Sequence, residues 1–392
     1  MNDNFNILDI INNLENYIIN EKYKGYDPYD GLSSPIFKLS ILKTNKLLRF
    51  GFQQFFRRIP FNLRPLLGIK KEVNPVTLGL AIQSFTYLIQ LFPEKEGFYK
   101  EQIDYCLNTL EALKSKGYSG TCWGYNFDWE ARYVKIPAYT PTIVATGFIT
   151  NGLYEYYKFS KDLGAKELIL DAVNFVLNDL NRTYEGNKFC FSYSPNDKQI
   201  VFNATMKAAR LLTQAYVLSG NKEMKSEIFN TVDFVMKYQT NEGYWSYAAG
   251  DARTWVDNFH TAYVLDALKI VNEVFENKYA VEFEKGVKYY VKTFFKDSGE
   301  AKYYSHKIYP IDSTQIAQSV ITLSANNMLG LANNVLNFGI ENLYSGKDYF
   351  FYRKYRLLTD KTSYMRWSNI WMYVAISYYL YFQRIKGEKN LV

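Results

Sequence analysis

Both histidines of the chain stand beside expected helices, where they could carry protons. His260 opens an apolar helical stretch just after Asp257, and His306 follows the aromatic phrase at Tyr304. Histidine changes its charge near neutral pH, so this pattern predicts general acid or base chemistry. The plainer alternative is that Asp257 caps a helix and that His260 is a packed, hydrogen-bonded residue.

Carboxylates and arginines also lie in the segments that lead into expected helices. The residues that we single out for chemistry are Asp128, Glu130, Arg132, Asp257, His260, His306 and Arg366. Asp128 and Asp257 could be the acid and the base of a glycoside hydrolase, which needs two carboxylates. In an epimerase or a lyase, a tyrosine or His260 would instead remove the proton alpha to a uronate carboxylate. A local set of ion pairs among Asp128, Glu130 and Arg132 is the alternative without chemistry.

Aromatic residues accompany these charges. The candidate substrate-binding residues are Trp123, Tyr125, Tyr139, Asn203, Trp245, Tyr247, Asp251, Arg253, Trp255 and Trp367. Aromatic side chains make up 18% of the sequence, and a tyrosine offers an apolar face and a polar tip to a sugar ring. Arg132, Arg253 or Arg366 could neutralise a substrate carboxylate. Alternatively, the aromatic phrases are wedges between helices.

A short sequence motif recurs along the chain, and its spacing determines how these residues can come together. The aligned threonines that open apolar helical stretches, 65, 63, 56 and 53 residues apart, are Thr77, Thr142, Thr205, Thr261 and Thr314. Four of them, Thr142, Thr205, Thr261 and Thr314, are most simply helix N-caps, as are Asn203 and Asp312. A sixth, degenerate copy begins near Tyr364, and each repeat has room for two helices. The first helix of each repeat is apolar and the second is amphipathic, which predicts an inner and an outer ring.

The sequence therefore predicts an all-α fold, an (α/α)6 toroid of helical hairpins with an N-terminal helical extension. The segments that join each outer helix to the next inner helix then lie at one end of the ring. We expect residues 1–71 to form the extension, with a helix from Ile7 to Asn20, and residues 72–392 to form the toroid domain.

All of the excess positive charge lies in residues 31–71, which hold nine basic residues and no acid. The whole chain has 46 Lys+Arg and 39 Asp+Glu; without the nine, 37 against 39 leaves a net charge of −2. Such a segment could lie on an anionic membrane surface or form one wall of a groove for an acidic polymer. A solvated helix packed on the outside of the domain is the alternative.

Cysteine usage and the terminus point to an intracellular protein. Cys106, Cys122 and Cys190 lack metal-ligand spacing, so we expect reduced thiols and no metal site. The N-terminus has no basic flank before an apolar core, and no stretch reaches about 18 uninterrupted apolar residues. We expect a cytoplasmic protein, peripheral to the inner face of the cell membrane, with no cofactor and no nucleic-acid partner.

The stretch from Asp257 to Leu265 resembles the helix start of protein prenyltransferase β-subunits. In that family the corresponding histidine is a zinc ligand, a role that the resemblance would carry onto His260. The family also needs an Asp-x-Cys pair one hairpin earlier, whereas residues 196–199 read Asn-Asp-Lys-Gln. The Asp-x-Asp-Asp motif of the related terpenoid cyclases is also missing. We therefore expect the toroid to be shared and neither chemistry to be.

Three phrases resemble the toroid proteins linked to bacterial exopolysaccharide and capsule synthesis, namely Asn62–Gly68, Trp123–Trp129 and Tyr364–Trp367. Glucuronyl C5-epimerases resemble the chain locally around Phe259-His260-Thr261. These resemblances imply a carbohydrate-active toroid in surface-polysaccharide synthesis, acting on an oligo- or polysaccharide that could be lipid-linked, as an epimerase, lyase or hydrolase. A non-catalytic glycan-binding or scaffold subunit and an isoprenoid-binding protein without zinc stay open as alternatives.

Overall fold

The computed structural model describes residues 6–38, 44–132 and 134–389. Helices dominate these residues, and the strands are only two to four residues long. The expected all-α class is confirmed. Lys43 of the basic segment and Tyr133 lie outside the described residues.

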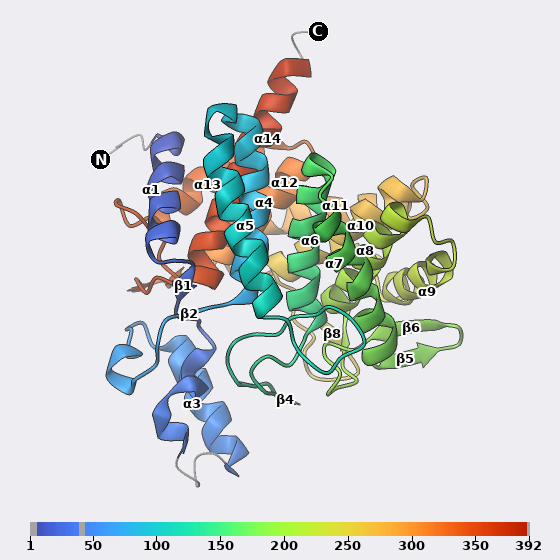
Figure 1. Ribbon diagram of the computed structural model, residues 1–392, viewed down its shortest axis with the longest axis horizontal. Coiled ribbons are helices and arrows are strands. Elements are labelled where there is room, and N and C mark those ends of the chain that lie inside the picture. Colours follow the sequence, from blue (N-terminus) through green and yellow to red (C-terminus); the bar gives the residue numbers. More distant parts are fainter. Residues whose placement is uncertain (1–5, 39–43, 133, 390–392) are drawn as a thin grey trace.

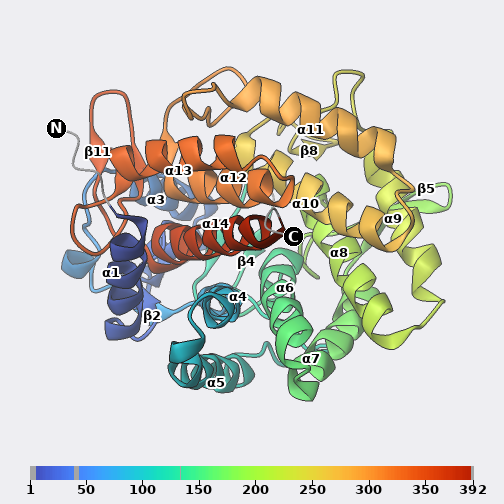
Figure 2. The ribbon, with the colours of Figure 1, turned by 90° about the horizontal axis from the view of Figure 1, so that it is seen from above.

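Within the described residues, six apolar helices form an inner ring (Figures 1 and 2). They are α4 (Pro75–Leu91), α6 (Ile143–Ser160), α8 (Phe202–Ser219), α10 (Asn258–Val274), α12 (Ser313–Ala325) and α14 (Ile370–Lys389). Each packs against the next, and α14 packs against both α12 and α4, so the ring is closed. Closure removes the need for the polar capping repeats of an open solenoid.

The outer helices cover this ring, each beside the inner helix that precedes it in the chain (Figure 2). They are α5 (Glu96–Ala112), α7 (Leu163–Asn174, continued by π-helical residues Phe175–Asp179), α9 (Met224–Lys237), α11 (Ala280–Phe294) and α13 (Leu329–Leu343). Their outward faces are exposed while their inward residues are buried, as the amphipathic pattern predicts.

Helix α1 (Ile7–Asn20) takes the outer position beside α14. The Tyr373 hydroxyl of α14 donates a hydrogen bond to Glu15 at 2.7 Å, and Tyr17 is 2.7 Å from Ser363. A short pair of strands, β1 (Lys24–Gly25) with β2 (Glu72–Val73), then joins the first segment to the start of the ring. The division of the chain at residue 72 stays a prediction, and α1 supplies the sixth outer helix.

Side-chain caps start most of the inner helices. The carboxylates of Asp257 and Asp312 and the hydroxyl of Thr142 accept backbone N–H groups of their first turns, as predicted. The prediction that Thr205, Thr261 and Thr314 are caps is wrong. The hydroxyls of Thr205, Thr261 and Thr314 lie inside the first turn and donate to backbone carbonyls, and α4 is capped by Asn74 rather than Thr77. Asn203 is also not a cap, because α8 starts from Val201 without a side-chain cap.

Short strands and turns gather at the end of the ring where the inner helices begin, in the lower part of Figure 1. The strands there are β3 (Trp129–Glu130), β4 (Lys135–Ile136), β5 (Arg182–Glu185), β6 (Lys188–Phe191), β7 (Ile200–Val201), β8 (Ala248–Ala249), β9 (Ile311–Asp312), β10 (Arg353–Lys354) and β11 (Thr359–Asp360). Helix α3 (Lys46–Arg58) lies at the same end, with the 3-10 turns Asp30–Ser33, Pro35–Lys38 and Pro65–Leu67. We call this end the rim.

The state of the cysteines and the length of the helices were both subjects of the sequence analysis. The three cysteines are buried, and none forms a disulfide. Among the described helices, we find none with both the length and the apolar character that crossing a bilayer requires.

Two glycines let α4 and α6 approach closely. A Cβ added to Gly152 would come 2.1 Å from the Gly79 carbonyl oxygen. Because the clash is with backbone, we predict that Gly152→Ala lowers the free energy of unfolding by about 1–3 kcal/mol, measured by urea unfolding. Gly97→Ala on α5, where no atom lies within 4 Å of the new Cβ, is the control and should be neutral or stabilising. Equal stability of wild type and Gly152→Ala would contradict this close packing.

Candidate functional site

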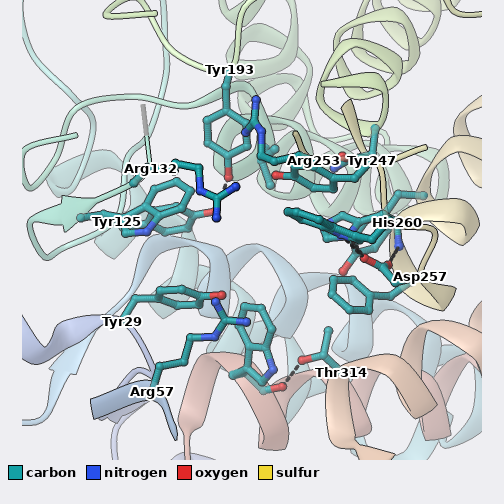
Figure 3. Close-up of a pocket in the computed structure, with 18 of the residues that line it drawn as sticks. Tyr29, Arg57, Tyr125, Arg132, Tyr193, Tyr247, Arg253, Asp257, His260 and Thr314 are labelled. Carbon is teal, nitrogen blue, oxygen red and sulfur yellow. Dashed lines mark hydrogen bonds and ion pairs between the residues drawn. The ribbon is translucent and has the colours of Figure 1, made fainter. Parts of the chain in front are cut away.

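A cavity of about 470 Å³ opens at the rim (Figure 3). Its walls come from the rim segments, from the first turns of inner helices and from the N-terminal segment. Seven tyrosines of the described chain line it: Tyr29, Tyr125, Tyr193, Tyr247, Tyr263, Tyr303 and Tyr304. A cavity of this size with aromatic walls and a few converging polar groups is a candidate ligand site.

Most of the residues singled out from the sequence meet in this cavity. Those that line it are Tyr125, Glu130, Arg132, Asn203, Tyr247, Arg253, Trp255, Asp257, His260, Arg366 and Trp367. Those outside the described lining are Trp123, Asp128, Tyr139, Trp245, Asp251 and His306. Eleven of the seventeen residues therefore line the cavity, and the other six lie outside its lining.

Asp257 holds His260 in place. One carboxylate oxygen, Oδ1, accepts the His260 backbone N–H at 3.0 Å and so caps α10, while Oδ2 lies 2.7 Å from His260 Nδ1. Oδ2 also accepts the Trp255 indole N–H at 3.1 Å. A carboxylate at Nδ1 fixes the proton on that nitrogen and leaves Nε2 as the proton acceptor. Asp257 is buried and His260 is only partly so, which leaves the imidazole accessible from the cavity.

Six of the seven tyrosines of the cavity are hydrogen-bonding groups whose pKa values are raised by burial. Tyr247 stacks on Trp255 with ring centroids 4.8 Å apart and meets the His260 ring edge-on at 4.6 Å. Burial raises the pKa of Tyr247 above its usual range. Burial likewise raises the pKa values of Tyr125, Tyr193, Tyr263, Tyr303 and Tyr304. The raised pKa values disfavour these tyrosines as bases, whereas the contact of His260 Nδ1 with Asp257 leaves Nε2 to accept a proton.

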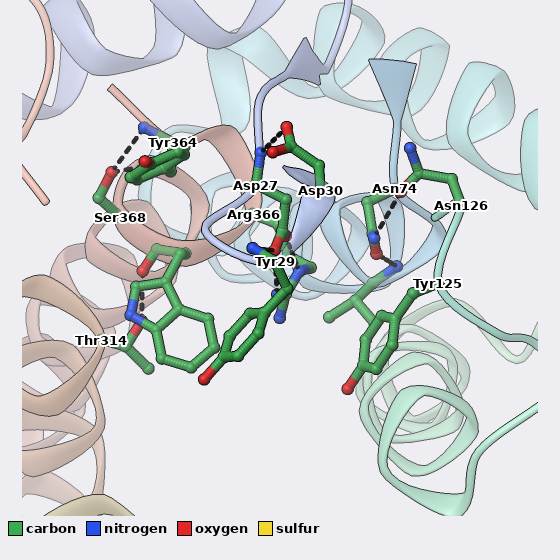
Figure 4. Close-up of polar contacts among 12 residues, drawn as sticks. Asp27, Tyr29, Asp30, Asn74, Tyr125, Asn126, Thr314, Tyr364, Arg366 and Ser368 are labelled. Carbon is green, nitrogen blue, oxygen red and sulfur yellow. Dashed lines mark hydrogen bonds and ion pairs between the residues drawn. The ribbon is translucent and has the colours of Figure 1, made fainter. Parts of the chain in front are cut away.

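Two of the three arginines expected to meet substrate are already paired with carboxylates. Arg366 forms a bidentate ion pair with Asp27, at 2.5 and 2.9 Å, and both residues are buried (Figure 4). Its guanidinium lies 4.9 Å from the centre of the Tyr125 ring. Arg253 Nη2 lies 2.6 Å from Asp251 Oδ2. Arg132, by contrast, is exposed at the cavity.

The two carboxylates expected to act in hydrolysis, Asp128 and Asp257, do not both line the cavity. Asp128 lies outside the cavity lining, where it accepts the Ala138 N–H at 2.9 Å and lies 3.3 Å from Lys135. Glu130 lines the cavity but is buried against Arg49, with Nε 2.7 Å from the carboxylate. The ion pairs of Asp128 and Glu130 are thus made with Lys135 and Arg49, not with Arg132 as the local ion-pair alternative expected.

Trp123 and Trp245 hold equivalent places in two repeats. Each indole N–H donates to a carbonyl of an outer helix, at 2.9 Å to Leu110 for Trp123 and at 3.0 Å to Val235 for Trp245. Both are wedges between a rim segment and the outer helix, and Trp245 also borders a minor hollow of about 10 Å³. Tyr139 and His306 are exposed away from the cavity lining. Contact of these four residues with substrate stays a prediction.

The N-terminal segment supplies lining residues that the sequence analysis did not single out. Tyr29 packs against Trp129 and Trp367, with ring centroids 5.9 and 5.6 Å away. Phe50, Gln54 and Arg57 of α3 also line the cavity. Their spacing of four and three residues places them on one helical face, which is the sequence signal that could have identified them.

The cavity floor is apolar and covers a buried lysine. Phe148 lies between Tyr263 and Trp371, with ring centroids 5.2 and 5.0 Å away. Beneath them, the Lys207 ammonium nitrogen is 3.5 Å from the centre of the Phe148 ring and 4.0 Å from that of Tyr263. Burial, followed by the nearby Arg210, lowers the pKa of Lys207.

The residues of the zinc resemblance do not assemble into a metal centre. Across residues 6–38, 44–132 and 134–389, no group of three or more His, Cys, Asp and Glu side chains could hold a metal ion. Asp197, in the region of the missing Asp-x-Cys pair, accepts the Ser194 backbone N–H at 2.8 Å and its hydroxyl at 2.5 Å. His260 is instead held by Asp257, as described above.

Comparisons with known proteins establish the fold. Neither a protein-family model nor a curated protein sequence matches this chain. Cellobiose 2-epimerase from Spirochaeta thermophila is similar in structure, with TM-score 0.59 and 9% identity over 80% of this chain and 87% of that chain. A glycoside hydrolase family 76 mannosidase from Bacteroides thetaiotaomicron has TM-score 0.59 and 10% identity over 97% and 100%. A D-mannose isomerase has TM-score 0.56 and 11% identity over 79% and 87%. The chain is therefore an α/α toroid protein.

The Asp27–Arg366 ion pair should carry a large share of the stability. Asp27→Asn leaves the Arg366 charge buried without a counter-ion, so we predict a loss of about 3–5 kcal/mol in the free energy of unfolding, measured with urea. Lys100→Met, which removes the exposed Lys100–Glu96 pair, is the control and should leave stability unchanged. Wild-type stability in Asp27→Asn would show that the pair is not buried in solution.

Proposed function

We propose that this protein is a carbohydrate-active enzyme and that His260 moves a proton at a sugar carbon inside the cavity. The observation that carries the proposal is the contact between His260 Nδ1 and the buried Asp257 at 2.7 Å. Structures similar in fold include, by name, a sugar 2-epimerase, a sugar isomerase and a mannosidase. Aromatic walls suit the apolar faces of a sugar ring, and Asn203 offers a carbonyl oxygen with no protein partner in the described residues.

The proposed step is proton transfer at a carbon next to a carbonyl or carboxylate. The C–H bond breaks, its proton goes to His260 Nε2, and the electron pair moves onto the adjacent oxygen. Asp257 stabilises the imidazolium that forms, and neutral tyrosine hydroxyls donate hydrogen bonds to the developing oxyanion. Return of a proton to the opposite face gives an epimer, whereas loss of a beta oxygen gives a lyase product.

Proton transfer fits this cavity better than hydrolysis does. A glycoside hydrolase needs one carboxyl group to protonate the leaving oxygen and a second to activate water or attack the sugar. Here Asp257 is engaged with His260 and Trp255, and Glu130 is engaged with Arg49. An isoprenoid ligand fits less well, because five arginines line the same cavity: Arg57, Arg58, Arg132, Arg253 and Arg366. A non-catalytic glycan-binding role is the second candidate, since the aromatic walls support it equally.

Deuterium exchange separates catalysis from binding. With cellobiose, mannose or uronate oligosaccharides in D2O, we predict that the wild type exchanges a carbon-bound hydrogen of its substrate, followed by NMR. His260→Gln should slow this exchange by about 10²–10⁴-fold because the proton acceptor is lost. Arg356→Gln, exposed and outside the cavity lining, should exchange at the wild-type rate. Binding of a sugar without exchange in the wild type would favour the glycan-binding role.

We also propose that the rim contacts an anionic membrane, where a lipid-linked substrate of surface-polysaccharide synthesis would be found. Leu47 and Phe55 of α3 are 80% and 52% exposed, and Phe61 and Leu66 just after it are 67% and 83% exposed. These apolar side chains lie in the segment that holds all of the excess positive charge. Exposed apolar groups together with cations are the combination that attaches proteins to anionic bilayers.

Liposome flotation tests this contact. The wild type should float with vesicles that contain phosphatidylglycerol and stay behind with pure phosphatidylcholine, because the attraction is partly electrostatic. Leu47→Asp combined with Leu66→Asp should reduce flotation at least several-fold. Leu357→Asp is the control, because Leu357 is 93% exposed outside the basic segment. Equal flotation with the two vesicle types would contradict the contact.

A further inference from the structure

Arg57 differs from the other arginines that are buried or half-buried at the rim. Those others each have a carboxylate: Arg49 with Glu130, Arg64 with Asp30, Arg253 with Asp251, Arg353 with Asp312 and Arg366 with Asp27. For Arg57, the described part of the chain provides neither an ion pair nor a side-chain hydrogen bond. Its Nε is buried without an acceptor, and its guanidinium lies 5.3 Å from the centre of the Tyr29 ring.

An unpaired cation in this position favours an anionic ligand. A buried donor without an acceptor costs about 1–3 kcal/mol, which an oxyanion that fills the site would recover. Arg57 lines the cavity on the side across from Tyr193 and Arg253 (Figure 3). Its planar guanidinium suits the paired oxygens of a carboxylate or a phosphate.

The charge balance of the cavity agrees with this. Of the lining carboxylates in the described residues, Glu130 is neutralised by Arg49 from outside the lining, and Asp257 faces His260. Arg253 and Arg366 are matched by Asp251 and Asp27. Among the described residues, the lining arginines without a carboxylate in an ion pair are Arg57, Arg58 and Arg132. A cavity with this excess of positive charge attracts and retains anions.

We propose that Arg57 binds the anionic group of the substrate, so that the substrate class is an acidic sugar carrying a carboxylate or a phosphate. This inference rests on the proposed function, because it concerns the same cavity. The sugar ring then lies among the aromatic walls, with its acidic group on the α3 side and a carbon within reach of His260. Arg57 is a binding residue in this arrangement, and it takes the role that the sequence analysis gave to Arg132, Arg253 or Arg366.

Isothermal titration calorimetry tests the proposal with four probes: glucuronate, glucose 6-phosphate, glucose and inorganic phosphate. The wild type should bind an acidic sugar at least 10-fold more tightly than glucose. Arg57→Met should lower the affinity for the acidic sugar about 10–100-fold and leave that for glucose unchanged, while Arg57→Lys should keep part of the preference. The choice between glucuronate and glucose 6-phosphate identifies the anion, and inorganic phosphate reports whether the anion alone suffices.

Controls separate this inference from the proposed chemistry. Arg356→Met removes one exposed positive charge outside the cavity and should not change any affinity. His260→Gln should keep the preference for the acidic sugar over glucose, so failure of the proton-transfer proposal leaves this result intact. Circular dichroism of each variant confirms folding, and Arg57→Lys serves where Arg57→Met is unstable. Equal affinity for acidic and neutral sugars, no binding of either acidic sugar, or unchanged affinity in both Arg57 variants would overturn the proposal.

Discussion

The buried ion pair between Asp27 and Arg366 is the contact on which the rim depends. It joins residues 339 positions apart, from the N-terminal segment and from the turn that opens α14 (Figure 4). A charge in the interior is costly without its partner, so neither residue can be buried unless the two segments meet. Their meeting places Tyr29 and α3 over the open end of the ring. The ring alone therefore supplies only part of the cavity wall, and the N-terminal segment supplies the rest.

A second constraint is the use of helix caps as anchors for functional side chains. Asp257 caps α10 while it accepts the Trp255 indole and fixes His260. Asp312 caps α12 while it accepts the Trp367 indole at 3.1 Å and pairs with Arg353. One carboxylate thus starts a helix, holds an aromatic wall and orients a basic group. The same kind of cap therefore holds different groups in the two repeats, because both the tryptophan and the basic partner come from different positions in the chain.

The ring could be predicted from the sequence because its signal is local and repeated. The apolar first helices and the Asp257–His260 pair each lie within a single repeat. The aligned threonines recur from one repeat to the next. The partner of Arg366 could not be chosen from the sequence, because several acids were available and Asp27 lies 339 residues away in the chain. Arg57 was missed for a related reason, since its segment has no counterpart in the repeats. Thr261 and Thr314 do not cap α10 and α12, because Asp257 and Asp312 precede them in the chain and provide stronger acceptors.

The rim and the N-terminal segment together line one cavity, and we propose that it binds an acidic sugar between His260 on one side and Arg57 on the other. A crystal structure of the His260→Gln protein with glucuronate bound tests this most directly. We predict the carboxylate of the sugar within about 2.7–2.9 Å of the Arg57 guanidinium and a ring carbon facing residue 260. A sugar bound elsewhere, or bound in this cavity with its carboxylate turned away from Arg57, would contradict the account.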